Sequence, residues 1–97
     1  MNDYELEITG GGRAGEVSYK EKEQAGALGF WWEFSMDGVI ISIPSDAKWN
    51  DYCERENVEW AKNRKPEIVE RIAAETRRQK ASAAVIDIED EWVNLRF

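Results

Sequence analysis

The fold of this chain is decided by the segment Leu28–Ile43, which reads LGFWWEFSMDGVIISI. Asp37-Gly38 favours a two-residue type I′ turn, because both central positions of that turn need a positive φ. Strand-forming residues flank the turn on both sides, so the segment predicts a β-hairpin. A turn at these two residues predicts three opposed pairs: Met36 with Val39, Phe34 with Ile41, and Trp32 with Ile43.

This register divides the hairpin into two faces, because successive side chains of a strand point to opposite sides. The six paired residues share one face, and we expect that face to cover the hydrophobic core. The other face carries the remaining strand residues: Trp31, Glu33, Ser35, Ile40 and Ser42.

Two further strands are predicted before the hairpin. Residues 4–9 alternate apolar with polar, which gives a half-buried strand with Glu5 and Glu7 on its outer face. Gly10, Gly12 and Gly15 match the spacing of a dinucleotide-binding loop, but a strand-like pattern follows them. A phosphate site needs a helix there, so we interpret the glycines as a hairpin loop.

Two helices are predicted after the hairpin. Trp49 and Cys53 lie on an apolar stripe at helical spacing, which Ser45 or Asp46 could cap and Asn57 interrupts. Pro66 suits the first turn of a second helix, because the N–H that proline lacks would be unpaired there anyway.

Two short strands are predicted at the end of the chain. Residues 84–88 and 93–97 alternate, with a turn at Asp90-Glu91 between them. The order ββββ-αα-ββ predicts an α+β fold in which two helices pack on one face of an antiparallel sheet. We expect residues 1–97 to form a single globular domain.

Composition excludes several functions. The net charge is −7, which disfavours nucleic acid and anionic membranes as partners. The chain has no histidine and one cysteine, so it lacks histidine-based catalysis, histidine metal sites and an intramolecular disulfide. Its start does not resemble a signal peptide and no apolar run could span a bilayer, so we expect a cytoplasmic protein. We predict no enzymatic activity and no cofactor.

A carboxylate cluster near the C-terminus has the oxygen ligands that a metal site would need. The cluster comprises Asp87, Glu89, Asp90 and Glu91. Calcium and magnesium take oxygen ligands, but the glycine and the later glutamate of an EF-hand loop are missing. We therefore interpret the cluster as a solvated acidic strand edge, and predict no metal. Cys53 lies on the apolar helix stripe, so we expect a buried, inert thiol.

The tryptophans divide into two groups. Trp32 and Trp49 fit the core, whereas Trp31 falls on the opposite face and Trp92 is out of phase with its strand. Trp31, Ile40 and Trp92 would form an exposed apolar patch, unless a helix or a terminal strand covers that face. Tryptophan is enriched at binding hot spots.

These features favour an interaction module. We predict a small acidic protein that binds a basic protein partner, in the manner of an immunity-type or phage-type inhibitor. The predicted partner-binding residues are Trp31, Ile40, Glu5, Glu7, Asp87, Glu89 and Trp92. The acidic members form one surface if the first strand lies near the fifth. The alternative is a domain that binds a small ligand or a divalent cation, and exposed apolar strand faces also suit a homodimer.

Overall fold

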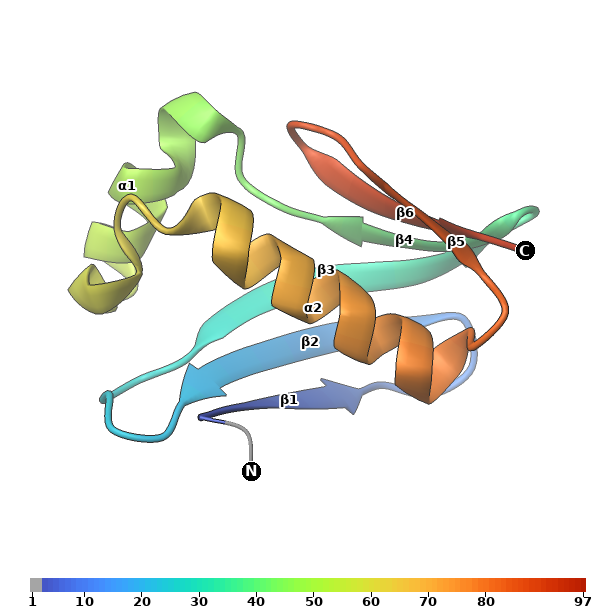
Figure 1. Ribbon diagram of the computed structural model, residues 1–97, viewed down its shortest axis with the longest axis horizontal. Coiled ribbons are helices and arrows are strands. Elements are labelled where there is room, and N and C mark those ends of the chain that lie inside the picture. The colour runs from blue at the N-terminus through green and yellow to red at the C-terminus, as the bar shows by residue number, and fades with distance from the viewer. Residues whose placement is uncertain (1–2) are drawn as a thin grey trace.

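The computed structural model describes residues 3–97 and confirms the predicted α+β order. Figure 1 shows the helices on one side of the sheet, with α2 lying across its face. The elements in chain order are β1 (Tyr4–Thr9), β2 (Ala14–Glu21), β3 (Leu28–Ser35), β4 (Gly38–Ser42), α1 (Asp46–Arg55), the 3₁₀ turn η1 (Glu59–Ala61), α2 (Lys65–Lys80), β5 (Val85–Ile88) and β6 (Trp92–Arg96).

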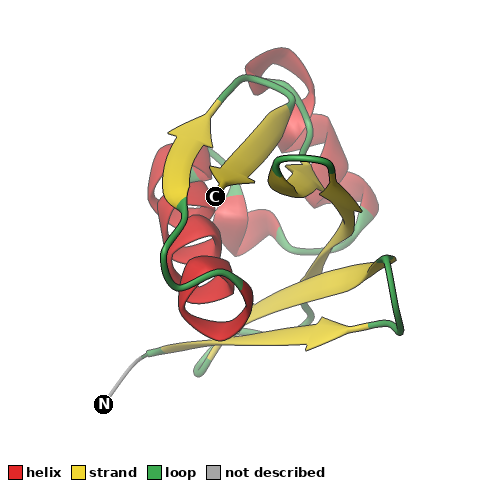
Figure 2. Cartoon of the chain, turned by 90° about the vertical axis from the view of Figure 1, so that its right-hand side faces the viewer, coloured by secondary structure: helices red, strands yellow, loops and turns green. Residues whose placement is uncertain are grey.

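The strands form one antiparallel sheet in the order β1-β2-β3-β4-β6-β5. The last strand of the chain therefore lies between β4 and β5, and β1 and β5 are the two edges. Both edge strands contact α2. Figure 2 shows how the sheet curls to bring β1 and β5 to either side of this helix. The helices thus fill the concave side, and no helix or strand of residues 3–97 forms a second layer on the convex side.

The predicted hairpin exists, but its register differs by one step. Ser35 pairs with Gly38, so Met36 and Asp37 form the turn. Gly38 belongs to β4, where a Cβ atom would lie 1.8 Å from the carbonyl oxygen of Leu95 on β6. The residue is glycine because the neighbouring strand comes so close.

The slip leaves the predicted faces of the two strands intact, except at Met36. Met36 lies in the turn and is fully exposed, so its predicted place on the core-covering face is wrong. Phe34 pairs with Val39 instead of Ile41, and Trp32 pairs with Ile41 instead of Ile43. Each partner changes by two residues, which is the period of side-chain alternation in a strand. Trp32 and Ile41 therefore still point into the core, and both are buried.

The core lies between the concave face of the sheet and the helices. The sheet contributes aromatic and aliphatic side chains, α1 contributes Trp49 and Cys53, and α2 contributes aliphatic side chains. Trp32 and Trp49 are each only 2% exposed, which confirms their predicted place. Cys53 is buried as predicted, and burial raises the pKa of its thiol.

The glycine-rich segment is a hairpin loop, as predicted. It joins β1 to β2, and no helix follows it. Gly10 has a φ of 112°, which L-residues with side chains rarely adopt. A Cβ atom on Gly15 would lie 1.9 Å from the carbonyl oxygen of Thr9. These two glycines allow the backbones to approach, and they leave no helix N-terminus at which a phosphate group would bind.

The helix boundaries follow the predicted signals, with one correction. Asn57 has a φ of 58° just after α1, and Pro66 lies in the first turn of α2. Ser45 precedes α1 but makes no capping hydrogen bond with its side chain. The Asp46 N–H instead donates to Asp90 Oδ1 at 2.7 Å, so a residue from the β5–β6 turn caps this helix.

Candidate functional site on the open face of the sheet

The convex face of the sheet carries two exposed tryptophans. Trp31 on β3 is 55% exposed and Trp92 on β6 is 44% exposed. Ser42 on β4 pairs with both of them, so the three residues form one row across neighbouring strands. The helices pack on the opposite face, and both indoles therefore face solvent.

Ile40 completes this apolar surface. It pairs with Glu33 on one side and Asn94 on the other, which places it in the row next to Ser42 on the same face. Its side chain is partly exposed. We refer to Trp31, Ile40, Ser42 and Trp92 as the tryptophan patch. The structure brings the three apolar residues predicted for this site together.

Two carboxylates border the tryptophan patch. Glu16 on β2 pairs directly with Trp31, and Glu33 lies two residues further along the strand that carries Trp31. Both side chains are exposed. Within residues 3–97, neither makes a hydrogen bond or an ion pair, so their charges face solvent uncompensated. The sequence analysis placed Glu33 on this face without assigning it a role, and it missed Glu16.

The other predicted acidic residues do not form one surface. Glu5 and Glu7 lie on β1 at one edge of the sheet, and Asp87 lies on β5 at the other. The expectation that the first strand lies near the fifth is wrong for this face, because four strands separate them. Glu5 Oε1 lies 3.9 Å from Lys20 Nζ, and Asp87 forms an ion pair with Arg96.

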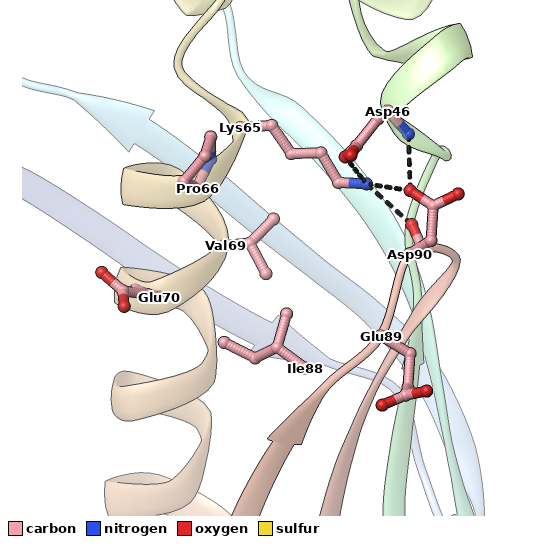
Figure 3. Close-up of a pocket in the computed structure, with 8 residues that line it drawn as sticks. All are labelled: Asp46, Lys65, Pro66, Val69, Glu70, Ile88, Glu89 and Asp90. Atoms are coloured by element: carbon pink, nitrogen blue, oxygen red, sulfur yellow. Dashed lines mark hydrogen bonds and ion pairs between the residues drawn. The ribbon is translucent and has the colours of Figure 1, made fainter.

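Glu89 lies outside the open face altogether. It follows β5 in the turn to β6, where its N–H donates to the carbonyl oxygen of Trp92 at 2.8 Å. Its side chain borders a pocket beside α2 (Figure 3). Of the seven predicted residues, Trp31, Ile40 and Trp92 therefore form the central site. Glu5, Glu7 and Asp87 lie on the edge strands, and Glu89 lies outside the open face.

The pocket beside α2 is the second candidate site. It has a volume of about 420 Å³ and lies between the starts of the two helices and the β5–β6 turn. Its walls are apolar where Pro66, Val69 and Ile88 contribute, and its rim is acidic. Figure 3 shows Lys65 reaching across the top of the pocket towards Asp90.

The ammonium group of Lys65 is fully engaged. Its Nζ lies 2.7 Å from Asp46 Oδ1, 2.7 Å from the Asp90 carbonyl oxygen and 3.1 Å from Asp90 Oδ1. An ammonium has three N–H donors, so none remains for an anionic ligand. The hydrogen bond from the Asp46 N–H, together with Lys65, holds the pKa of Asp90 below its usual range. This cluster ties α1, α2 and the β5–β6 turn together.

A second polar network joins β2 to α2, and the sequence analysis did not find it. Glu21 accepts hydrogen bonds from Arg64 at 2.7 and 3.0 Å and from Tyr19 at 2.7 Å. Arg71 donates to Tyr19 at 3.1 Å and lies 4.8 Å from the centre of the Tyr4 ring. The two arginines lie 43 to 52 positions from their partners on β2, so no local pattern signals these contacts.

Burial and charge act on this network in opposite directions. Burial raises the pKa of Glu21, but the hydrogen bonds from Arg64 and Tyr19 and the charges of Arg64 and Arg71 outweigh it, so the pKa is lowered. Burial raises the pKa of Tyr19 to about 12. Each polar group has a partner within the network, which makes it a structural support.

The described residues offer no metal centre. Within residues 3–97, no three side chains of the metal-binding types Cys, His, Asp and Glu lie close enough together to hold an ion. Asp87 pairs with Arg96 and Asp90 pairs with Lys65, whereas the Glu89 side chain borders the pocket beside α2. None of the helices in that part of the chain is long and apolar enough to cross a membrane.

Comparison with known proteins gives no relative from which to transfer a function. No family model, curated protein or solved structure matches the chain.

Proposed function

We propose that this chain is a small protein-binding module whose open sheet face docks on a basic protein. One observation carries the proposal: Trp31 and Trp92 are exposed in a single row of a face that no helix within residues 3–97 covers. Clustered exposed apolar residues mark interaction sites, and tryptophan contributes strongly to binding energy at such sites.

The negative charge of the same face favours a basic protein as the partner. Glu16 and Glu33 border the tryptophan patch without ion pairs among residues 3–97, and the whole chain carries a net charge of −7. Such a field speeds association with a positively charged surface and repels nucleic acid and anionic membranes. An inhibitor of the immunity type or phage type, acting in the cytoplasm by binding alone, has this combination of a stable scaffold and an acidic docking face.

Affinity capture from a lysate of the native host tests the proposal. The baits are the wild-type chain, Trp31→Ala and Phe97→Ala, each used at low and at high salt. Phe97 is 73% exposed and follows β6 at the far end of the sheet, so it is a matched exposed aromatic outside the patch. We expect a basic protein that is recovered by the wild-type and Phe97→Ala baits and lost with Trp31→Ala. Equal recovery by all three baits would contradict the proposal.

The pocket beside α2 favours a second function, the binding of a small ligand. Its apolar walls and acidic rim suit an organic amine better than an anion, because the Lys65 ammonium is already engaged. A thermal-shift screen of small amines tests this function. A stabilising amine should lose its effect with Ile88→Trp, which fills the pocket, and keep it with Trp31→Ala.

A further inference from the structure

We propose that the space between Trp31 and Trp92 receives the guanidinium group of an arginine side chain of the partner. This inference rests on the proposed function and names the group that the open face recognises. Ser42 lies between the two tryptophans and pairs with both. Its side chain is small, so it adds little bulk between the two tryptophans.

The spacing of the two strands leaves room for a planar group. Trp31 and Trp92 lie on strands separated by one other strand, so their backbones are about 10 Å apart. A flat group held between two rings needs about 7 Å, since carbon atoms in contact lie about 3.5 Å apart. The indoles need only lean towards each other over Ser42 to hold one planar group.

The other tryptophans show what these two lack. Lys80 Nζ lies 5.4 Å from the centre of the Trp32 ring, and the Arg64 guanidinium carbon lies 6.0 Å from that of Trp60. Within residues 3–97, no cation and no aromatic ring lies against Trp31 or Trp92. The chain therefore supplies a cation to two of its inner tryptophans and leaves the two outer ones open to a cation from outside.

Carboxylates beside the rings select a positive charge. Glu16 is the cross-strand neighbour of Trp31, and Glu33 is diagonal to Ser42. An arginine between the rings would present N–H groups to Glu33 and to the Ser42 hydroxyl while its plane stacks on the indoles. Arginine suits this site better than lysine, because its planar group stacks on aromatic rings and donates in fixed directions.

The same charges disfavour a second copy of this chain as the occupant. Two identical open faces would bring Glu16 and Glu33 of one copy against those of the other. A symmetric dimer pairs the same patch with itself, so these unpaired charges would repel. The face therefore favours a partner of opposite charge.

Titration with short peptides tests the inference without the natural partner. The probes are hexa-arginine, hexa-lysine and hexa-glutamate peptides, followed by calorimetry and by the indole N–H resonances of isotope-labelled protein. We expect hexa-arginine to bind more tightly than hexa-lysine, to shift the Trp31 and Trp92 resonances, and to leave the buried Trp49 resonance in place. Hexa-glutamate should not bind.

Three variants locate the site, and one serves as a control. Trp31→Ala, Trp92→Ala and Ser42→Leu should each weaken hexa-arginine binding about 3- to 10-fold, because each removes a ring or fills the space between the rings. Phe97→Ala should leave the affinity unchanged. Ser42→Leu is the sharpest test, since it preserves both tryptophans and every charge. Circular dichroism confirms that each variant is folded.

Three outcomes would overturn the inference, and a fourth would overturn only the proposed function. Equal binding of both basic peptides by all variants would mean that only net charge is sensed. Concentration-dependent dimers in sedimentation, abolished by Trp31→Ala, would identify a second copy as the occupant. Capture of a protein that needs Trp31 but tolerates Ser42→Leu would retain the proposed function and refute the arginine site. Peptide binding as expected, with no Trp31-dependent capture, would retain the site and refute the proposed function.

Discussion

Trp31 and Trp32 are neighbours in the chain and opposites in the fold. Trp32 is 2% exposed, donates from Nε1 to the Thr9 carbonyl oxygen at 2.9 Å and packs edge-on against Phe34. Trp31 is 55% exposed and makes none of these contacts among residues 3–97. One residue type thus has two roles, and the face of the strand decides which role applies.

The polar groups of the two faces differ in the same way. On the helix side, Glu21 and Lys65 each have several hydrogen-bond partners. Within residues 3–97, Thr76 Oγ1 is the one buried side-chain nitrogen or oxygen atom without a hydrogen bond. On the open side, Glu16 and Glu33 have no ion pair within that range. The helix side satisfies its own charges, whereas the open side leaves charges available to another molecule.

The largest effect on stability is expected from Trp32→Ala. The substitution removes a buried indole and leaves the Thr9 carbonyl oxygen without its donor. We expect a loss of about 3–5 kcal/mol in the free energy of unfolding, measured by urea denaturation. Trp32→Phe keeps most of the buried volume and should cost less. If Trp32→Ala cost no more than Trp31→Ala, the distinction between the two faces would be lost.

The next largest effect is expected from Gly38→Ala. The added Cβ would lie 1.8 Å from the Leu95 carbonyl oxygen, so β4 and β6 must move apart. We expect a loss of about 2–3 kcal/mol. Gly11→Ala is the control, because an added Cβ there has no atom within 4 Å. Equal loss in both variants would contradict this account, because only the Cβ at position 38 meets the backbone of β6.

The hairpin around Gly38 shows what can be predicted from sequence and what cannot. The faces of the hairpin were predictable, because a slip of two residues in the partner preserves alternation. The register was not, because Gly38 serves the contact with β6 and the turn lies one step earlier. A dipeptide that favours a turn cannot reveal a strand that arrives more than fifty residues later.

The candidate site was predictable to the same extent. Alternation placed Trp31 and Ile40 on one face, and this needed no knowledge of the strand order. The position of Trp92 beside them depends on β6 lying next to β4. The separation of Glu5 from Asp87 depends on β1 and β5 lying at opposite edges of the sheet. Long-range strand order was beyond the sequence, and so was the Glu21 network, which joins β2 to α2.

A smaller and pH-dependent effect is expected from Glu21→Gln. The pKa of Glu21 in the folded chain lies below its ordinary value of 4.5. A lowered pKa stabilises the fold above pH 4.5, and this contribution is lost as the pH falls through the folded-state pKa. We expect Glu21→Gln to cost about 1–2 kcal/mol at pH 7 and progressively less towards pH 3, measured by urea denaturation across that range. A difference from the wild type that does not change with pH would contradict this account.

The smallest effect on stability is expected from Trp31→Ala. The exposed indole has no hydrogen bond, stacked ring or cation within residues 3–97. The substitution therefore removes only the apolar contact made by the buried part of the Trp31 side chain. We expect a change within about 0.5 kcal/mol, measured beside Trp32→Ala under the same conditions. A loss of about 2 kcal/mol or more would mean that the indole supports the sheet, and the tryptophan patch would then be part of the fold. If Trp31→Ala changes stability little and also abolishes capture of a basic protein, then Trp31 serves binding. Trp32, its neighbour on the same strand, would then serve stability.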